Sequence, residues 1–261
     1  ILFYYLFIYY FLKNIKFNRL ILLATFTPIF ILYPISEIEV LARKEILIYI
    51  LFFIFISIRL NFLKRFIIIS LSLLIWEPVI FFLPFWFLID LIKSNKKNNI
   101  YQILNMLYGY LPILILCPIF IFNPLTAQEH SDMVFNLTQR NQYCGLSCGL
   151  LGSKKSVIDQ VQHIFLLTPE IIFRYLFIII LGFLPLFILL YFSKLIEKIF
   201  IFQFLNQNLF LIFFLLFLPL IPCMIFMSDW GRVVNISYVH MFISYIYLYK
   251  NKHIEFDLSL K

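Results

Sequence analysis

Charged residues are scarce in this chain: Asp, Glu, Lys and Arg make up 13% of its 261 residues, whereas a soluble globular domain carries about 25%. Glycine is rare as well, with 6 residues, and none of them belongs to a G-x-x-x-x-G-K-[ST] or G-x-G-x-x-G phosphate loop. The H-E-x-x-H metalloprotease motif is also missing. These absences argue against a soluble enzyme and against ATP-driven transport by this chain alone.

Long apolar runs take the place of the missing charges. About 20 apolar residues cross the hydrocarbon layer as a helix, and hydrophobic residues make up 63% of the chain. The predicted spans are Leu20–Ile35, Ile46–Ile58, Ile100–Phe122, Tyr175–Ser193, Leu209–Met227 and Val233–Tyr249. The sequence therefore predicts an all-α fold, a polytopic transmembrane helical bundle that forms a single integral membrane domain over residues 1–261. Because Ile1 already lies in an apolar run, we expect an N-terminal segment to be missing.

One further apolar run, Phe66–Ile89, carries a carboxylate at its centre. Glu77 is followed directly by Pro78, and proline removes a backbone donor and disfavours helix at the residue before it. Two arrangements are open. Either the run crosses the membrane once, or it enters, breaks at Glu77 and Pro78, and returns as a re-entrant or broken segment over residues 66–92.

The distribution of basic residues favours the re-entrant arrangement, because lysine and arginine in short loops favour the cytoplasmic side. If the segment returns, 14 of the 21 basic residues share that side; they fall around residues 13–19, 59–65, 93–97 and 194–198 and in the C-terminal tail. If it crosses once, the bias nearly vanishes. The same rule accounts for the net charge of +8, so no nucleic-acid partner is predicted.

The polar stretch Asn123–Glu170 then forms an extracytoplasmic loop. It contains Cys144 and Cys148, whose spacing in an oxidising compartment predicts a disulfide, with two free thiols as the alternative. Metal binding would need more ligands than the two histidines of this loop provide, so no metal site and no cofactor are predicted. Ser156–Leu167 has the apolar spacing of a short amphipathic helix.

Glu77 is the first candidate site residue, because a charged side chain at the bilayer centre costs ~2.5–3.5 kcal/mol on insertion scales. It fits a general base, a proton carrier or a ligand for a polar substrate. The structural alternative is a hydrogen bond that stabilises the break at Pro78.

A second polar cluster, Asp229-Trp230-Gly231-Arg232, separates the last two apolar runs. The planar guanidinium of Arg232 matches phosphate or carboxylate, and Asp229 would hold it in place. Trp230 also fits an interfacial aromatic, and Gly231 fits a sharp turn. His240 follows Arg232 by about two helical turns. It could act as a relay residue, or it could simply be hydrogen-bonded within the helix. The candidate catalytic residues are Glu77, Asp229 and Arg232; the candidate substrate-binding residues are Trp230, Gly231 and His240.

Two short motifs carry a resemblance. Trp76-Glu77-Pro78 with Phe81-Phe82 and Pro84, together with Ser228-Asp229-Trp230-Gly231-Arg232 before the last span, resembles a group of uncharacterised multi-pass bacterial membrane proteins of surface-polysaccharide loci, which are similar in layout to O-antigen polymerases. In that group a histidine typically precedes the acid, whereas Trp76 stands here. The resemblance implies transfer or polymerisation of sugars carried on polyprenyl diphosphate, with Arg232 at the leaving diphosphate and Glu77 or Asp229 as base.

Two other classes of function stay open. A secondary transporter would use Glu77 as a mid-membrane carboxylate that changes protonation. A non-catalytic assembly subunit would use its polar groups only to hold helices together. All three classes predict a multi-pass protein of the cell inner membrane whose partner is membrane lipid, and only the first requires a polyprenyl-diphosphate-linked sugar.

Overall fold

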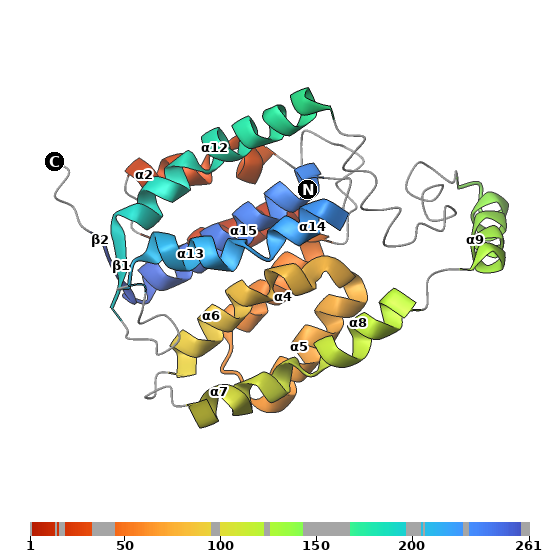
Figure 1. The fold of residues 1–261 in the computed structure, drawn as a ribbon, viewed down its shortest axis with the longest axis horizontal. Coiled ribbons are helices and arrows are strands. Elements are labelled where there is room, and N and C mark those ends of the chain that lie inside the picture. The colour runs from red at the N-terminus through yellow and green to blue at the C-terminus, as the bar shows by residue number, and fades with distance from the viewer. Residues whose placement is uncertain are drawn as a thin grey trace.

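The computed structural model of the chain is almost entirely helical, which confirms the predicted all-α class (Figure 1). It describes residues 2–13, 15, 19–32, 45–94, 100–122, 126–142, 168–196, 205, 207–226 and 230–256. The first elements are α1 (Leu2–Leu12), α2 (Arg19–Thr25), the π-helical turn η1 (Pro28–Leu32), α4 (Glu45–Ser57), α5 (Phe62–Ile75), the 3-10 helix η3 (Glu77–Phe82) and α6 (Leu83–Ser94). They are followed by α7 (Ile100–Leu107), η4 (Tyr108–Tyr110), α8 (Pro112–Phe122), α9 (Ala127–Gln139), α12 (Pro169–Tyr191), β1 (Ser193–Leu195), α13 (Leu209–Phe217), α14 (Leu220–Phe226), α15 (Trp230–Lys250) and β2 (Ile254–Phe256).

The described parts of the predicted spans are mostly helical, but several of the helices are interrupted. α12 has 23 residues, which gives a length of about 34 Å at 1.5 Å per residue. Among the described residues it is the one helix that is both long enough and apolar enough to cross a membrane unaided. The 209–226 segment divides into α13 and α14 at Leu218 and Pro219, where proline has no N–H to donate to the helix.

α15 is the central helix of the bundle, with every residue from Val233 to Ile246 buried. A helix that is buried all round has to satisfy its polar side chains inside the protein. Tyr238 accordingly donates a hydrogen bond to the carbonyl of Ala24 at 2.6 Å. Other polar side chains of α15 reach α4 and β1: Asn235 bonds with Tyr49, and Tyr245 with Ser193.

Contacts along the chain show that α4, α6 and α15 run in the same direction. Tyr49 of α4 is bonded to Asn235 of α15, and Phe52, one turn later, packs on His240. Phe52 also packs on Trp86 of α6, and Lys93 at the end of α6 reaches the end of α4. α12 follows the same direction, because Phe183 packs on Tyr238 and Ser193 lies beside Tyr245.

The carboxyl ends of these four helices therefore gather at one end of the bundle, where β1 and β2 pair antiparallel (Figure 1). We call this the basic end. The basic residues that the structure describes there are Arg59, Lys64, Arg65, Lys93, Lys194, Lys250 and Lys252. The opposite end, called the far end, contains η3, the end of α14 and the starts of α12 and α15 (Figure 1). The two three-residue strands were not predicted from the sequence, because so short a segment has no distinctive periodicity.

α12 presents a continuous apolar face to the outside of the bundle. Six of its large apolar side chains are each at least 46% exposed: Phe173, Leu176, Phe177, Ile180, Leu181 and Leu184. Soluble monomers rarely expose so large an apolar patch, and such patches mark surfaces that meet lipid or protein.

The long polar loop contains one helix that the sequence analysis did not predict. α9 is capped by Thr126, whose hydroxyl accepts from the N–H of Glu129 while the Glu129 carboxylate accepts from the N–H of Thr126. The Thr-x-x-Glu spacing of a capping box was the available signal. The predicted amphipathic helix Ser156–Leu167 and the predicted Cys144–Cys148 disulfide lie outside the described residues.

Candidate functional site

The chain reverses direction at Trp76, Glu77 and Pro78. α5 ends at Ile75, and Trp76 adopts an extended conformation with φ −159° and ψ 108°. Pro78 then occupies the first turn of η3, where its missing N–H costs no hydrogen bond. α6 returns alongside α5, so that α5, η3 and α6 form a helical hairpin with Glu77 at its tip.

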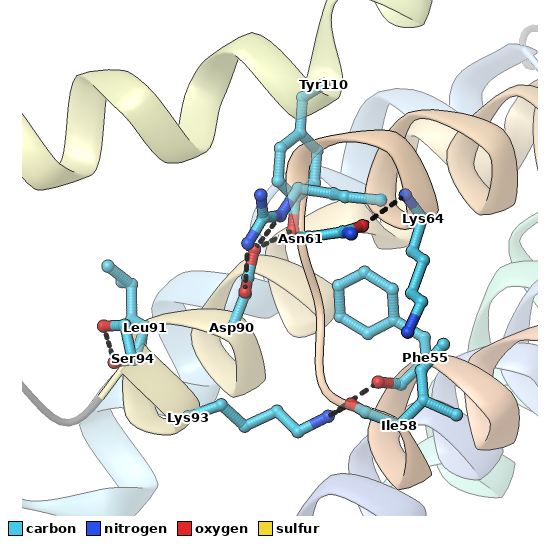
Figure 2. A network of polar contacts seen from close by, with 10 residues as sticks. Phe55, Ile58, Asn61, Lys64, Asp90, Leu91, Lys93, Ser94 and Tyr110 are labelled. Carbon is cyan, nitrogen blue, oxygen red and sulfur yellow. Dashed lines mark hydrogen bonds and ion pairs between the residues drawn. The ribbon is translucent and has the colours of Figure 1, made fainter.

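A buried ion pair closes the base of this hairpin. Arg65, near the start of α5, donates from Nε to Asp90 Oδ2 at 2.5 Å and from Nη2 to Oδ1 at 2.8 Å. Asp90 lies near the end of α6, and both residues are buried. The Tyr110 hydroxyl lies 3.5 Å from Asp90 Oδ2 on the α7–α8 side (Figure 2). Two parallel N–H···O bonds to one carboxylate fix the relative orientation of the two helices as well as their distance.

Lys93 joins the same end of the hairpin to α4. Its Nζ donates to the carbonyls of Phe55 and Ile58 at 2.8 and 2.6 Å (Figure 2). Carbonyls at a helix carboxyl end have no partner within the helix, and they carry the negative end of the helix dipole. Lys93 lies beyond the 66–92 segment. Partial burial lowers the pKa of its ammonium group to about 8, although the nearby Asp90 carboxylate acts in the opposite direction and raises it.

Glu77, which is central in the apolar run, lies at the exposed tip of the hairpin. The tip contacts α8 and α14 at the far end of the bundle. The Glu77 carboxylate is therefore exposed at the far end of the bundle.

Arg232 lies at the same end, half-buried in the first turn of α15. α6 runs parallel to α15, and η3, which leads into α6, meets α15 where the rings of Phe82 and His240 pack with their centroids 5.2 Å apart. Arg232 precedes His240 by eight residues, about 12 Å of helix. Glu77 precedes Phe82 by five residues of 3-10 helix, about 10 Å. The two side chains therefore belong to the same level of the bundle, and α14 contacts the elements that carry both.

The other members of the second cluster have different positions. Trp230 is engaged inside the protein: its Nε1–H donates to the carbonyl of Met224 at 2.7 Å, and its ring packs edge-on against Tyr175 at 5.3 Å. Gly231 is helical, so the predicted sharp turn at Gly231 is wrong; α15 already begins at Trp230. Asp229 lies outside the described residues.

His240 is not brought together with Glu77 and Arg232. It lies in the core with no exposed surface, and its Nδ1 is 2.9 Å from the carbonyl of Ile236, one turn earlier in α15. Aromatic rings from α4, η3 and α6 surround it.

The partnership of Arg65 and Asp90 was not predicted from the sequence. The signal was present, because Arg65 precedes Glu77 by twelve residues and Asp90 follows Pro78 by twelve residues. Opposite charges at equal distances from a helix break are expected to meet if the chain folds back. A second overlooked pattern is Gly145-Leu146-Ser147-Cys148-Gly149, which has the G-x-S-x-G spacing. It lies outside the described residues.

Comparison of the chain with protein-family models, with curated proteins and with solved structures gives no match.

Proposed function

We propose that this chain is a polytopic membrane protein of cell-surface polysaccharide assembly, which transfers or polymerises sugars carried on polyprenyl diphosphate. One observation carries the proposal: Glu77 at the tip of the α5–α6 hairpin and Arg232 in the first turn of the central helix lie at the same end of the bundle. That end is opposite to the basic end.

Membrane insertion is supported by the distribution of charge and apolar surface. The basic end follows the rule that lysine and arginine stay on the cytoplasmic side, and the apolar face of α12 would meet lipid. α5 has 14 residues, about 21 Å of helix, which is less than the ~30 Å hydrocarbon layer. We therefore take the hairpin as a re-entrant segment that enters from the cytoplasmic side, with its tip directed toward the outer face.

The chemistry of the two side chains fits a lipid-linked sugar donor. The planar guanidinium of Arg232 would bind the diphosphate and stabilise its charge as it leaves. The Glu77 carboxylate would accept the proton of the acceptor hydroxyl. Because Glu77 is exposed at the tip of the hairpin, the structure gives less support to a transporter that depends on a buried mid-membrane carboxylate.

Complementation of a deletion strain tests this proposal. Glu77→Gln keeps the shape of the side chain without its charge, and Arg232→Lys keeps the charge without the planar fork. Both variants should lose long-chain surface glycan while membrane abundance stays normal. Full glycan synthesis by both variants would contradict the proposal, and loss of abundance would assign these residues to the fold.

Two matched controls come from the same end of the bundle. Glu170→Gln and Arg174→Lys change the same residue types at exposed positions in the first turns of α12. Both controls should make normal glycan, because both side chains are exposed on α12 and belong to neither the hairpin nor α15.

A further inference from the structure

Three buried polar atoms near the centre of the bundle have no hydrogen-bond partner among the described residues. They are Nε2 of His240, Nε1 of Trp86 and Oγ of Ser244. Buried polar atoms in folded proteins nearly always have a partner, either protein or an ordered water. Three such atoms on the packed helices α6 and α15 point to a shared binding position.

The three atoms are complementary in hydrogen bonding. His240 Nδ1 lies 2.9 Å from the Ile236 carbonyl, which can only accept, so Nδ1 carries the proton and Nε2 is an acceptor. The Trp86 indole N–H is only a donor, and the Ser244 hydroxyl can do both. A ligand bound by all three must therefore both donate and accept.

Packing and helix geometry place the three side chains next to one another at the α6–α15 contact. The His240 and Trp86 rings are 6.2 Å apart and nearly parallel, with an interplanar angle of 27°. The Phe52 ring packs against both, with its centroid 4.6 Å from that of His240 and 4.9 Å from that of Trp86. Ser244 follows His240 by four residues and so lies on the same face of α15, one turn toward the basic end. Trp86 extends in that direction too, because it also packs on Phe55 at 5.0 Å.

The surroundings exclude a charged ligand. The rings that pack on His240 come from Tyr49, Phe52, Phe82, Phe85 and Trp86, and none of these side chains carries a charge that could balance an ion. An unpaired ion in such a place would pay a large desolvation cost. The ligand is therefore small and neutral.

We propose that His240, Trp86 and Ser244 form a binding site for a single internal water molecule. The water accepts from the Trp86 N–H, donates to His240 Nε2 and shares a further hydrogen bond with the Ser244 hydroxyl. Three partners are typical of a buried structural water. The water links α6 to α15 at the centre of the bundle, deeper than the level of Glu77 and Arg232, so this inference is independent of the proposed function.

Nuclear magnetic resonance of the full chain in detergent micelles, with ¹⁵N in tryptophan and histidine rings, tests this site. The Trp86 indole proton should show cross-relaxation to a long-lived water. The Trp230 indole, which donates to the Met224 carbonyl, is the internal control and should show none. The His240 Nε2 signal should have the shift of an unprotonated nitrogen that accepts a hydrogen bond.

A pair of serine variants separates a shared water from independent groups. Ser244→Ala should shift both the Trp86 indole and the His240 Nε2 resonances. Ser237→Ala should shift neither, because the Ser237 hydroxyl donates to the Val233 carbonyl of its own helix at 2.6 Å. The proposal is overturned if the Trp86 indole proton shows no water contact, or if Ser244→Ala shifts neither resonance. A scalar coupling that reveals a direct hydrogen bond between the Trp86 and His240 ring nitrogens would also overturn it.

Discussion

Arg65 and Asp90 are 25 residues apart in the chain and meet in a buried bidentate ion pair at the base of the α5–α6 hairpin. The pair brings the two ends of the 66–92 segment to one end of the bundle. Its position explains how a run of apolar residues with a proline at its centre becomes two antiparallel helices.

The first prediction concerns the ion pair itself. Asp90→Ala leaves the Arg65 charge buried without its partner, and we expect the free energy of unfolding to fall by about 3–5 kcal/mol. The double variant Arg65→Met with Asp90→Leu should recover most of this loss, because apolar residues can replace a buried pair. Denaturation of the detergent-purified protein measures both effects.

Arg59→Met is the control for the ion pair, because Arg59 is exposed at the same end. It should change the free energy of unfolding by less than about 0.5 kcal/mol. A double variant as unstable as Asp90→Ala would contradict the assignment of the loss to an unpaired Arg65 charge.

The second prediction concerns the close approach of η4 to α5. A Cβ atom at Gly109 would overlap the Arg65 side chain. Gly109→Ala should therefore displace Arg65 and lower the free energy of unfolding by about 1–3 kcal/mol, the usual cost of overpacking. Gly231→Ala is the matched control; it should stabilise the helix by up to about 1 kcal/mol, because Gly231 is helical. Equal effects of the two variants would rule out a specific contact at Gly109.

The third prediction is a pH dependence at Lys93. The pKa of Lys93 is about 8 in the folded protein, below its ordinary value of 10.5. Between these two pH values the unfolded chain therefore holds the Lys93 proton more often than the folded chain does. Stability should therefore rise as the pH increases from about 8 to 10.5. Lys93→Met should reduce this rise, whereas Lys64→Met, at an exposed position in α5, should not. Melting temperatures of the three proteins across this range test the prediction, and identical slopes would contradict it.

The fourth prediction concerns topology. Single cysteines at Lys64 and Lys96 should both react with a membrane-impermeant thiol reagent only after the cells are opened, because a re-entrant hairpin returns to the side from which it started. A cysteine at Ser131 of α9 should react in intact cells. Labelling of position 96 from outside sealed cells would exclude the re-entrant arrangement and would require a single crossing.

Local features of the chain could be predicted because their physical cause is local. Pro78 cannot donate a backbone hydrogen bond, and the helix indeed ends next to it, at Ile75. Thr168 occupies the N-cap position of α12 and Pro169 lies in its first turn, where the missing N–H costs no hydrogen bond. The exposure of Glu77 could not be predicted in this way, because the hydropathy of a run does not tell whether its centre is a midpoint of a span or the tip of a hairpin.

The sequence by itself determined that this chain is helical and where its helices break, since apolar run length and the missing N–H of proline act over a few residues. Only the tertiary structure decided which of these helices are neighbours. The meeting of Arg65 with Asp90, the common level of Glu77 and Arg232, and the enclosure of His240 by rings from α4, η3 and α6 all depend on contacts between segments distant in the chain. Such contacts arise from the packing of whole helices against one another, and no local pattern of residues specifies them.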